Sequence, residues 1–391
     1  MATKQVTLFQ PPPLDPSKAP IENVLELTPV LDIGPDVFTN TRPLWHPPGA
    51  RGIYGGAAIA QSLSAAQRTV PANFTVHSMH CYFVLAGDSE IPILYHVERV
   101  RDGKSFATRT VQARQRGRPI FTTTLSFSRE DSGGKKKLEH AVPMPDVPLP
   151  EEDDDAATES GGGGPFESRR AGILNHDSPN PEDKKVRQFI RARGRISDAG
   201  GHQAHLSALA YMSDSYFIGT VSRVHHIPRF PSAAALQSAL KSLKNPSDLD
   251  DDTIKRYVKE LAEQESEAAE MLLKSSSSDS SKNGGKDLKT KTEALAAAVS
   301  KRCNNDEHSD KQIGMMVSLD HTIYFHNPRA FRADEWLFTE MDSPWAGEGR
   351  GLVTQRIWNK DGVLIATCVQ EGVVRLKQDD PVSSPPRSAK L

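Results

Sequence analysis

The sequence predicts an α+β fold made of two tandem repeats, in which each repeat packs one helix on an antiparallel sheet. Three observations lead to this prediction. Regions in which apolar and polar residues alternate flank short turns in both halves of the chain. A helical segment precedes each of these regions. Two landmarks also recur at almost the same spacing, since His77 aligns with His321 at an offset of 244 and Gly117 aligns with Gly362 at an offset of 245.

The first repeat is expected to span residues 21–130 and the second residues 184–376. In the first repeat, an alanine-rich helix begins at Gly55 and ends before Pro71, because proline cannot continue a helix. In the second repeat, apolar residues at helical spacing predict a helix over 205–220. Each helix is followed by a β-hairpin. The expected hairpins are 105–114 with 119–128 around a turn at 116–118, and 351–358 with 363–376 around a turn at 359–362.

Two segments of biased composition interrupt these repeats. Residues 131–183 are rich in acidic residues, glycine and proline, which predicts a flexible linker. Residues from about 245 to 312 contain serine and glycine runs beside a charged helical stretch, which predicts a low-complexity insertion inside the second repeat. A solvated helix is the favoured interpretation of that stretch, and a partner-binding helix is the alternative.

The composition favours a soluble globular protein in a reducing compartment. The formal net charge is only −2, so no strong field favours nucleic acid or anionic lipid, and nucleic acid is not an expected partner. The three cysteines lie far apart and show no CxxC spacing. Neither a secretory apolar segment nor a run of eighteen apolar residues is present, so neither secretion by that route nor a membrane span is expected.

The C-terminal tail, 377–391, ends in Ala389-Lys390-Leu391. A small residue, a basic residue and leucine at the extreme C-terminus resemble the peroxisomal import tripeptide. The tail before it is polar and contains prolines, so the tripeptide is expected to be accessible. We therefore expect a location in the peroxisomal matrix and an import receptor as one partner.

The sequence contains partial matches to three common motifs, but none of them is complete. Gly103-Lys104-Ser105 ends like a phosphate-binding loop, but position 98, where that loop needs glycine, is Glu98. The same segment is followed by strand-like alternation, whereas a serine nucleophile elbow needs a helix there. The histidines at 202, 205, 225 and 226 show no metal-ligand spacing. The sequence therefore predicts neither a metal nor a cofactor.

Three polar residues stand in otherwise apolar runs: Asp214, Ser318 and Gln370. A buried polar group without a partner costs about 1 to 3 kcal/mol, so such groups usually contact one another or a shared water. The spacing alone leaves another possibility open. Asp214 would then cap or pair locally, Ser318 would bond to backbone, and Gln370 would face solvent.

The chain resembles acyl-CoA thioesterase II, the double-hotdog enzymes found in bacteria and in peroxisomes, over roughly Ile53–Glu130 and Ala204–Leu376. The motifs that carry the resemblance are Tyr54-Gly55-Gly56, His77-Ser78-Met79-His80, Arg101-Asp102-Gly103-Lys104-Ser105-Phe106, Tyr211-Met212-Ser213-Asp214, Ser318-Leu319-Asp320-His321, Asp361-Gly362-Val363-Leu364 and Val369-Gln370-Glu371-Gly372-Val373. The resemblance implies a double-hotdog fold and hydrolysis of fatty acyl-CoA to a free fatty acid and CoA.

The resemblance also implies that an acid, a hydroxyl and an amide orient the hydrolytic water, and these fall on Asp214, Ser318 and Gln370. Asp214 is the expected base, and its direct attack on the thioester is the minority alternative. The predicted insertion separates Asp214 from Ser318 by 104 residues, which departs from the bacterial pattern.

Substrate contacts are expected from two further groups of residues. Gly55 and Gly56 open a helix whose backbone N–H groups would stabilise an oxyanion, and close packing against the sheet is the alternative role for this pair. Cations are required by the CoA phosphates, and the candidates are Arg101, Lys104, Arg329 and Arg332.

Two other functions remain open from the sequence. One is a catalytically silent acyl-CoA-binding scaffold. The other is a hotdog enoyl-CoA hydratase, which would need an Asp and His pair in its own motif, and Asn327-Pro328 lacks that context. A homo-oligomer is expected by analogy with the fold.

Overall fold

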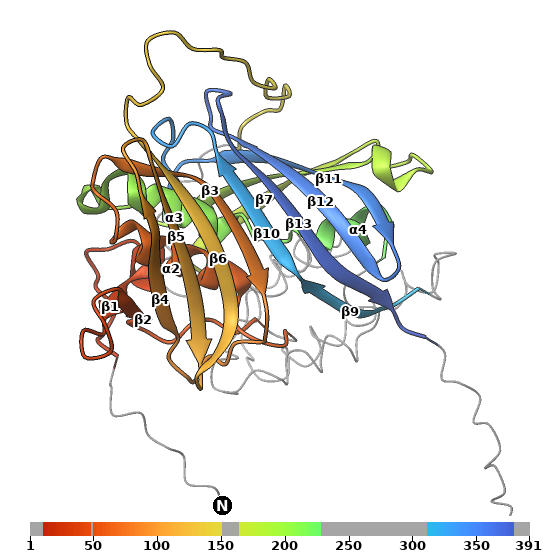
Figure 1. The fold of residues 1–391 in the computed structure, drawn as a ribbon. Coiled ribbons are helices and arrows are strands. Elements are labelled where there is room, and N and C mark those ends of the chain that lie inside the picture. The colour runs from red at the N-terminus through yellow and green to blue at the C-terminus, as the bar shows by residue number, and fades with distance from the viewer. Residues whose placement is uncertain (1–10, 48–49, 151–163, 228–310, 379–391) are drawn as a thin grey trace, which may run out of the picture.

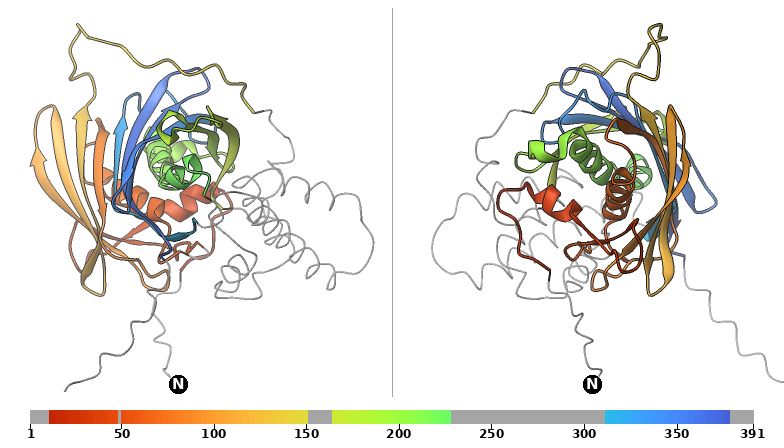
Figure 2. Two further views of the ribbon diagram at one scale, coloured as in Figure 1. Left: turned by 90° about the vertical axis from the view of Figure 1, so that its right-hand side faces the viewer. Right: turned by 60° about the vertical axis from the view of Figure 1, so that its left-hand side comes forward.

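One curved antiparallel sheet forms the body of the molecule, and two helices lie side by side in its hollow (Figures 1 and 2). The computed structural model describes residues 11–47, 50–150, 164–227 and 311–378, and in this part of the chain the sheet has thirteen strands. The predicted α+β double-hotdog architecture is confirmed.

The strands of the first half are β1 (Leu27–Pro29), β2 (Val37–Asn40), β3 (Phe74–Phe83), β4 (Leu94–Asp102), β5 (Phe106–Gln115) and β6 (Arg118–Arg129). Those of the second half are β7 (Phe166–Leu174), β8 (Lys185–Ala192), β9 (Ile313–Ser318), β10 (Asp320–Phe325), β11 (Leu337–Gly347), β12 (Arg350–Trp358) and β13 (Leu364–Leu376). Their order in the sheet is β1-β2-β4-β5-β6-β3-β10-β13-β12-β11-β8-β7, with β9 paired to β13. The helices are α1 (Pro20–Leu25), α2 (Gly55–Gln67), α3 (Gly201–Met212) and α4 (Gly219–Val224), with 3₁₀ turns η2 (Pro181–Asp183) and η3 (Asp198–Gly200).

The two halves meet where β3 pairs with β10, and the strand order is symmetric about this seam. Met79 pairs with Ile323 across the seam, and their numbers differ by 244, the same offset that relates the two aligned histidines in the sequence. Both side chains are fully buried. The seam therefore behaves as a local two-fold axis between the repeats, with this pair on the axis.

The aligned histidines themselves are not equivalent in the structure. A β-bulge between Val76 and Ser78 interrupts the pairing of β3 with β6. As a result His77 contacts Phe106, which is 50% exposed, on the outer face of the sheet. His321 on β10 is fully buried on the helix-bearing face. A shift of one residue in a strand turns a side chain to the other face, and sequence alignment does not reveal such a shift.

The β5–β6 hairpin forms around the predicted turn. Gln115 pairs with Arg118, and the two residues between them, Arg116 and Gly117, have φ angles of 49° and 72°. Two consecutive positive φ angles are those of a type I′ turn, whose twist matches that of the flanking strands. The hairpin of β12 and β13 likewise forms around its predicted turn, where the carboxamide oxygen of Asn359 accepts hydrogen bonds from the N–H groups of Asp361 and Val363.

The central helices are buried along most of their length, because the sheet curves around them and they pack against each other and against α1 (Figure 2). Small residues let α2 and α3 approach closely, and the hydroxyl of Ser64 donates to that of Ser207 at 3.1 Å. The second helix differs from the prediction of a single helix over 205–220. It ends at Met212, the chain adopts a positive φ of 54° at Tyr216, and a separate helix follows. Serines and aspartate directly after Met212 compete with the helical backbone for hydrogen bonds, which favours an end there.

Part of the range expected to be a flexible linker, 131–183, is built into the fold. Its last third forms β7, which pairs with β8. An earlier part crosses the outer face of the sheet, where Met144 and Val147 pack on a cluster of aromatic residues and the indole N–H of Trp358 donates to the carbonyl oxygen of Val142 at 3.1 Å. The aromatic cluster consists of Phe189, Trp336, Phe338 and Trp358. The apolar residues among the prolines explain this docking. The remaining linker residues 151–163, residues 245–310 of the predicted insertion, and the targeting tripeptide lie outside the described residues.

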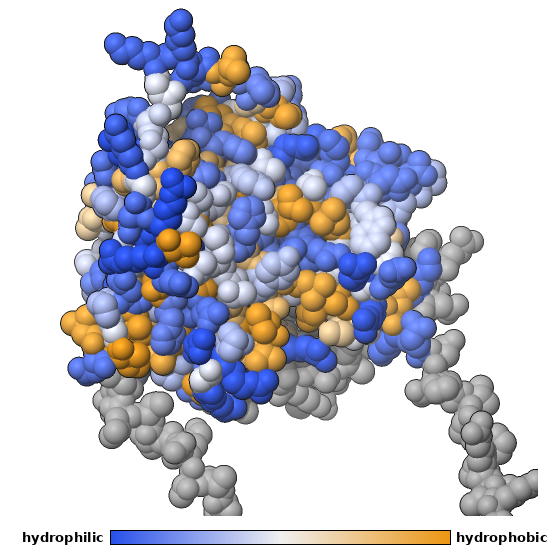
Figure 3. Space-filling view, viewed as in Figure 1, coloured by the Kyte–Doolittle hydropathy of each residue, from blue (hydrophilic) through white to orange (hydrophobic). Residues whose placement is uncertain are grey.

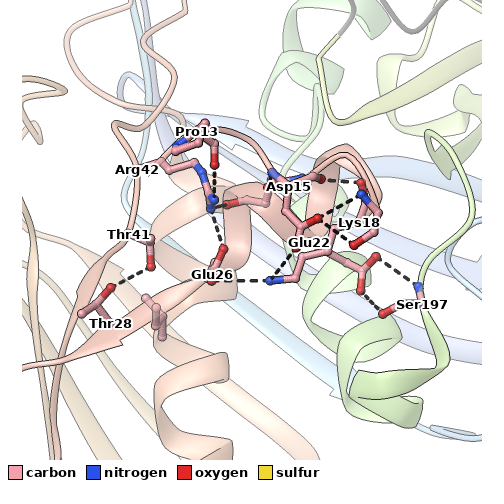
Figure 4. A network of polar contacts seen from close by, with 12 residues as sticks. Pro13, Asp15, Lys18, Glu22, Glu26, Thr28, Thr41, Arg42 and Ser197 are labelled. Atoms are coloured by element: carbon pink, nitrogen blue, oxygen red, sulfur yellow. Dashed lines mark hydrogen bonds and ion pairs between the residues drawn. The ribbon is translucent and has the colours of Figure 1, made fainter. Parts of the chain in front are cut away.

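Polar contacts tie the N-terminal segment to the second repeat (Figure 4). The carboxylate of Glu22 on α1 accepts hydrogen bonds from the backbone N–H of Ser197 at 3.0 Å and from its hydroxyl at 2.5 Å. Arg42 pairs with Glu26 at 2.6 Å and donates to the carbonyl oxygen of Pro13. The Glu22 contacts hold α1 against the segment that leads into α3, and the Arg42 contacts hold α1 to other residues of the N-terminal half.

The outer face of the sheet is mostly hydrophilic or intermediate, with apolar side chains in separated patches (Figure 3). Among the residues that the structure describes, no helix combines the length and apolar character needed to cross a membrane.

A fully buried arginine, Arg109 on β5, fixes the far end of α2. Its guanidinium donates to both the hydroxyl and the carbonyl oxygen of Thr69, just after the helix, at 2.8 and 2.9 Å. It also donates to the carbonyl oxygen of Arg101 and pairs with Asp102 at 2.5 Å. The segment Arg101–Phe106 therefore has a structural role at the β4–β5 turn.

Replacing Arg109 with methionine is expected to lower the free energy of unfolding by about 2 to 4 kcal/mol, because several buried acceptors lose their donor at once. Asp102 is 56% exposed, so water can solvate its carboxylate in the variant. The lost ion pair with Asp102 therefore contributes little to the decrease in the free energy of unfolding. The matched control is Arg99→Met, which breaks the ion pair between the half-exposed Arg99 and Asp36. This change is expected to lower the free energy of unfolding by under about 1 kcal/mol. Denaturant unfolding of the full chain measures both, and equal losses would contradict this account.

Candidate active site

The site lies where α3 ends against the sheet. The segment after Met212 turns over β12 and β13 at a pair of facing glycines, Gly351 and Gly372. A Cβ atom on Gly372 would lie 2.5 Å from Ile218, and one on Gly351 would lie 2.6 Å from Val221. Only glycine leaves room for this segment to lie directly on the sheet. The close contact holds the end of α3, and with it Asp214, near the middle of β13.

Asp214 and Gln370 are brought into direct contact. The side-chain nitrogen Nε2 of Gln370 donates to Oδ1 of Asp214 at 2.8 Å, although the residues are 156 positions apart. The backbone N–H of Gly56, at the start of α2, also donates a hydrogen bond to this carboxylate. The start of a helix favours negative charge, so three elements, α2, α3 and β13, converge on one acid.

Burial dominates the protonation of this acid. It raises the pKa of Asp214 to about 6, against the opposing effects of the hydrogen bonds from Gln370 and Gly56. A carboxylate with a pKa near 6 is still mostly ionised at neutral pH, and it accepts protons far more readily than a free aspartate. Such a pKa suits a general base.

Gln370 makes a second buried polar contact, to His321. Its Nε2 also lies 3.2 Å from Nδ1 of His321, and Nε2 of His321 lies 3.0 Å from the hydroxyl of Ser213. Gln370, His321 and Ser213 are all fully buried or nearly so. The carbonyl oxygen Oε1 of Gln370 is buried and has no hydrogen-bond partner among the described residues.

Ser318 lies on the neighbouring strand, opposite Gly372. Directly opposed residues point to the same face, and so do residues two apart on a strand, so Ser318 and Gln370 share the helix-bearing face. The pairing register shifts by one residue between β9 and β10, and Oδ1 of Asp320 accepts the backbone N–H of Glu371 at this irregularity. The hydroxyl of Ser318 makes no hydrogen bond to any residue that the structure describes.

The glycines expected to form an oxyanion site lie against Asp214. A Cβ atom on Gly55 would lie 2.7 Å from Oδ2 of Asp214 and 2.8 Å from the ring of Phe83. A Cβ atom on Gly56 would lie 2.3 Å from the carbonyl oxygen of Tyr211. Since the N–H of Gly56 is directed to the carboxylate, the observed role of the pair is close packing and support of the acid.

The four cations expected to bind CoA phosphates do not gather beside Asp214. Arg101 and Lys104 lie at the β4–β5 turn, near the C-terminal end of α2, whereas Gly55 at its start contacts Asp214. The thirteen residues of α2 place these two ends roughly 20 Å apart at 1.5 Å per residue.

The other two cations are held by carboxylates. Arg329 pairs with Glu130. Arg332 makes a bidentate pair with Asp334, with both N···O distances 2.9 Å. Neither guanidinium is therefore free to bind a phosphate without breaking an existing ion pair.

Two residues near the acid were not identified as site residues from the sequence. Tyr54 donates from its hydroxyl to the carbonyl oxygen of Tyr211 at 2.9 Å and so fixes the start of α2 against the end of α3. His321 contacts Gln370. Both belong to motifs that carry the family resemblance, which was the available signal, but their contacts are long-range and no local pattern encodes them.

Comparisons with known proteins agree with the fold. Residues 42–128 match the family model described as the acyl-CoA thioesterase N-terminal domain, and residues 144–374 match that of the C-terminal domain. Acyl-coenzyme A thioesterase 8 from Homo sapiens is 31% identical over 387 residues, which cover 94% of this chain and 92% of that protein. Peroxisomal acyl-coenzyme A thioester hydrolase 1 from Saccharomyces cerevisiae is 24% identical over 360 residues, which cover 90% and 94%. The crystal structure of an acyl-CoA thioesterase II from Mycobacterium marinum superposes with a TM-score of 0.55 at 26% identity, over 94% of this chain and 99% of that one.

Gly55→Ala is expected to lower the free energy of unfolding by about 1 to 3 kcal/mol, because the new methyl group overlaps both Asp214 and Phe83. The control is Gly219→Ala at the start of α4, where a Cβ atom has nothing within 4 Å. Thermal or denaturant unfolding compares the two variants. A Gly55→Ala protein as stable as the control would show that the close approach does not constrain the helix.

Proposed function

The chain belongs to the acyl-CoA thioesterase II family and is a thioester hydrolase, and from this premise we propose that Asp214, Ser318 and Gln370 together orient the water that hydrolyses fatty acyl-CoA. The observation that supports this most directly is the 2.8 Å contact between Asp214 and Gln370, which joins the end of α3 to β13 at one ionisable group. A functional site is a frequent reason for a partly buried carboxylate with a raised pKa.

In the proposed mechanism, a water molecule donates one hydrogen bond to the carboxylate of Asp214 and attacks the thioester carbonyl carbon. As the new C–O bond forms, the water proton passes to Asp214. The tetrahedral intermediate then collapses, the C–S bond breaks, and the proton held by Asp214 is delivered to the leaving sulfur. The products are a fatty acid and CoA with a free thiol.

Ser318 and Gln370 contribute by position in this proposal. Both face the helix-bearing side of the sheet, with Ser318 opposite the residue two after Gln370. Gln370 offers Oε1, and Ser318 offers a hydroxyl that no described residue engages. Two fixed partners beside a base restrict the rotation of a bound water and so reduce the entropy cost of attack.

We also propose that the protein works in the peroxisomal matrix. The support is the C-terminal tripeptide Ala389-Lys390-Leu391 and the name of the yeast relative, a peroxisomal acyl-coenzyme A thioester hydrolase. An import receptor would then be a partner. A homo-oligomer remains part of the proposal by analogy with the fold.

Thiol release from acyl-CoA by the purified protein tests the reaction. Asp214→Asn and Gln370→Leu, which keep side-chain size, are expected to lower kcat/KM at least 100-fold. The controls are Asp320→Asn, which keeps the acceptor for the N–H of Glu371, and Gln355→Leu, which alters another fully buried glutamine on the adjacent strand. Both controls should stay near wild type. Acyl-CoA binding by the wild type without thiol release would favour the scaffold, and hydration of enoyl-CoA would favour the hydratase.

The pH profile should reflect the ionisation of Asp214. The base must be ionised to accept a proton, and its pKa is raised to about 6, so kcat/KM is expected to rise with pH and to be half-maximal near pH 6. Activity is then lost as the pH falls below 6, while a free aspartate would keep it down to about pH 4. Steady-state kinetics between pH 4.5 and 8 measure this limb, and a flat profile over that range argues against Asp214 as the base.

A further inference from the structure

The amide of Gln370 has only one orientation that suits its neighbours. A carboxylate accepts hydrogen bonds, so the side-chain atom of Gln370 that lies 2.8 Å from Asp214 must be the nitrogen. That NH₂ group has two hydrogens. The second lies toward Nδ1 of His321 at 3.2 Å. With both hydrogens engaged, Oε1 is left as the acceptor that has no partner among the described residues.

His321 must therefore present an acceptor at Nδ1, which places its proton on Nε2. Ser213 enforces this tautomer. Because Nδ1 accepts from Gln370, Nε2–H of His321 donates to the hydroxyl oxygen of Ser213 at 3.0 Å, and the single hydroxyl hydrogen of Ser213 is then donated to the carbonyl oxygen of Ala210 at 3.0 Å. Each donor in this chain of bonds thus has an acceptor, from Ala210 on α3 to Asp214 beyond the same helix.

We propose that His321 and Ser213 are positioning residues, which hold the Gln370 amide with its N–H groups toward Asp214 and its Oε1 free to accept a hydrogen bond from the hydrolytic water. This inference rests on the proposed function of Asp214 and Gln370. Neither His321 nor Ser213 contacts substrate in this scheme. They act through Gln370.

The opposite tautomer shows why positioning matters. With a proton on Nδ1 of His321, the amide of Gln370 would turn so that Oε1 accepts from the ring. Oε1 would then face Oδ1 of Asp214, and two acceptors repel each other unless the acid is protonated. A protonated acid is not a base, so the wrong tautomer and the inactive form of Asp214 stabilise each other.

The surroundings keep His321 neutral and its ring fixed. Burial lowers the pKa of His321 to about 3, and the ring packs edge to face against Phe217 at 5.5 Å. Burial also holds the other titratable groups that face Asp214 uncharged near pH 7, since it raises their pKa values. These groups are Tyr54 before α2, Cys81 on β3, Tyr211 on α3 and Cys368 on β13. Strand alternation turns Asp320 away from them, toward the face that bears the 61% exposed Tyr82.

The first repeat does not reproduce this arrangement. His77 lies on the outer face because of the bulge in β3, and its Nε2 contacts the hydroxyl of Ser126 at 2.8 Å. The described part of the chain therefore has one set of such contacts.

His321→Leu tests the proposal because leucine removes the acceptor while keeping the site apolar. The expected result is a loss of kcat of roughly 10- to 100-fold with little change in KM, since water orientation matters only in the transition state. The acid limb of the kcat/KM profile should also move to higher pH by roughly 0.5 to 1 unit, because an amide that the ring no longer holds donates a weaker hydrogen bond to Asp214, and that hydrogen bond lowers its pKa. A residue with only a structural role would not move this limb.

Two further variants keep the test decisive if His321→Leu fails to fold, which circular dichroism and thermal unfolding reveal. His321→Asn places an amide oxygen near the position of Nδ1 and should recover most of the lost kcat. Ser213→Ala removes the tautomer control and should shift the limb in the same direction by a smaller amount.

Wild-type kcat and an unmoved acid limb in folded Ser213→Ala and His321→Leu proteins would overturn the inference, provided that Asp214→Asn and Gln370→Leu are inactive. Activity retained by Asp214→Asn and Gln370→Leu would instead refute the proposed function itself. The two failures are therefore distinguishable.

Discussion

The close approach of α2 and α3 within the curve of the sheet constrains most of the other features of this molecule. Alanines, glycines and serines line both helices, and a Cβ atom on Gly56 would lie 2.3 Å from the carbonyl oxygen of Tyr211. Because the helices are so close, the start of one reaches the acid that follows the other. The same contact shields Asp214 partly from water, and this burial raises its pKa. The packing of two helices thus sets the chemistry of one carboxyl group.

The buried polar residues around Asp214 must also find hydrogen-bond partners. In a site with little water, each donor and acceptor must find a partner or remain at a cost of about 1 to 3 kcal/mol. Gln370 satisfies this requirement by bonding to His321, and His321 by bonding to Ser213. The carbonyl oxygen Oε1 of Gln370 is left without a partner among the described residues. An unpaired acceptor beside a partly buried acid is where a polar ligand gains most, since folding has already removed that acceptor from water.

The periphery follows different rules. The buried Arg109 and the ion pair of Arg332 with Asp334 use their charges to hold loops and helix ends. Arg332 was itself expected to bind a phosphate, and so was Arg101, whose carbonyl oxygen accepts a hydrogen bond from Arg109. The segment that joins the repeats also has a structural role. Its apolar residues cover aromatic side chains on the outer face and so hold the linker against the sheet. Composition indicated that the linker is rich in acidic residues, glycine and proline, but it did not show which contacts its residues make.

The sequence by itself determined the features that depend on neighbours along the chain. Alternation and the Arg116-Gly117 pair predicted a hairpin, two offsets of about 244 predicted the repeat, and the polar residues in apolar runs, together with the resemblance, pointed to Asp214 and Gln370. Tertiary structure decided which side chains meet. The bulge that turns His77 outward and the contact between Gln370 and His321 both depend on packing between segments that lie tens of residues apart in the sequence. Local periodicity carries no record of such contacts, because the free energy that selects them comes from burying groups against distant parts of the chain.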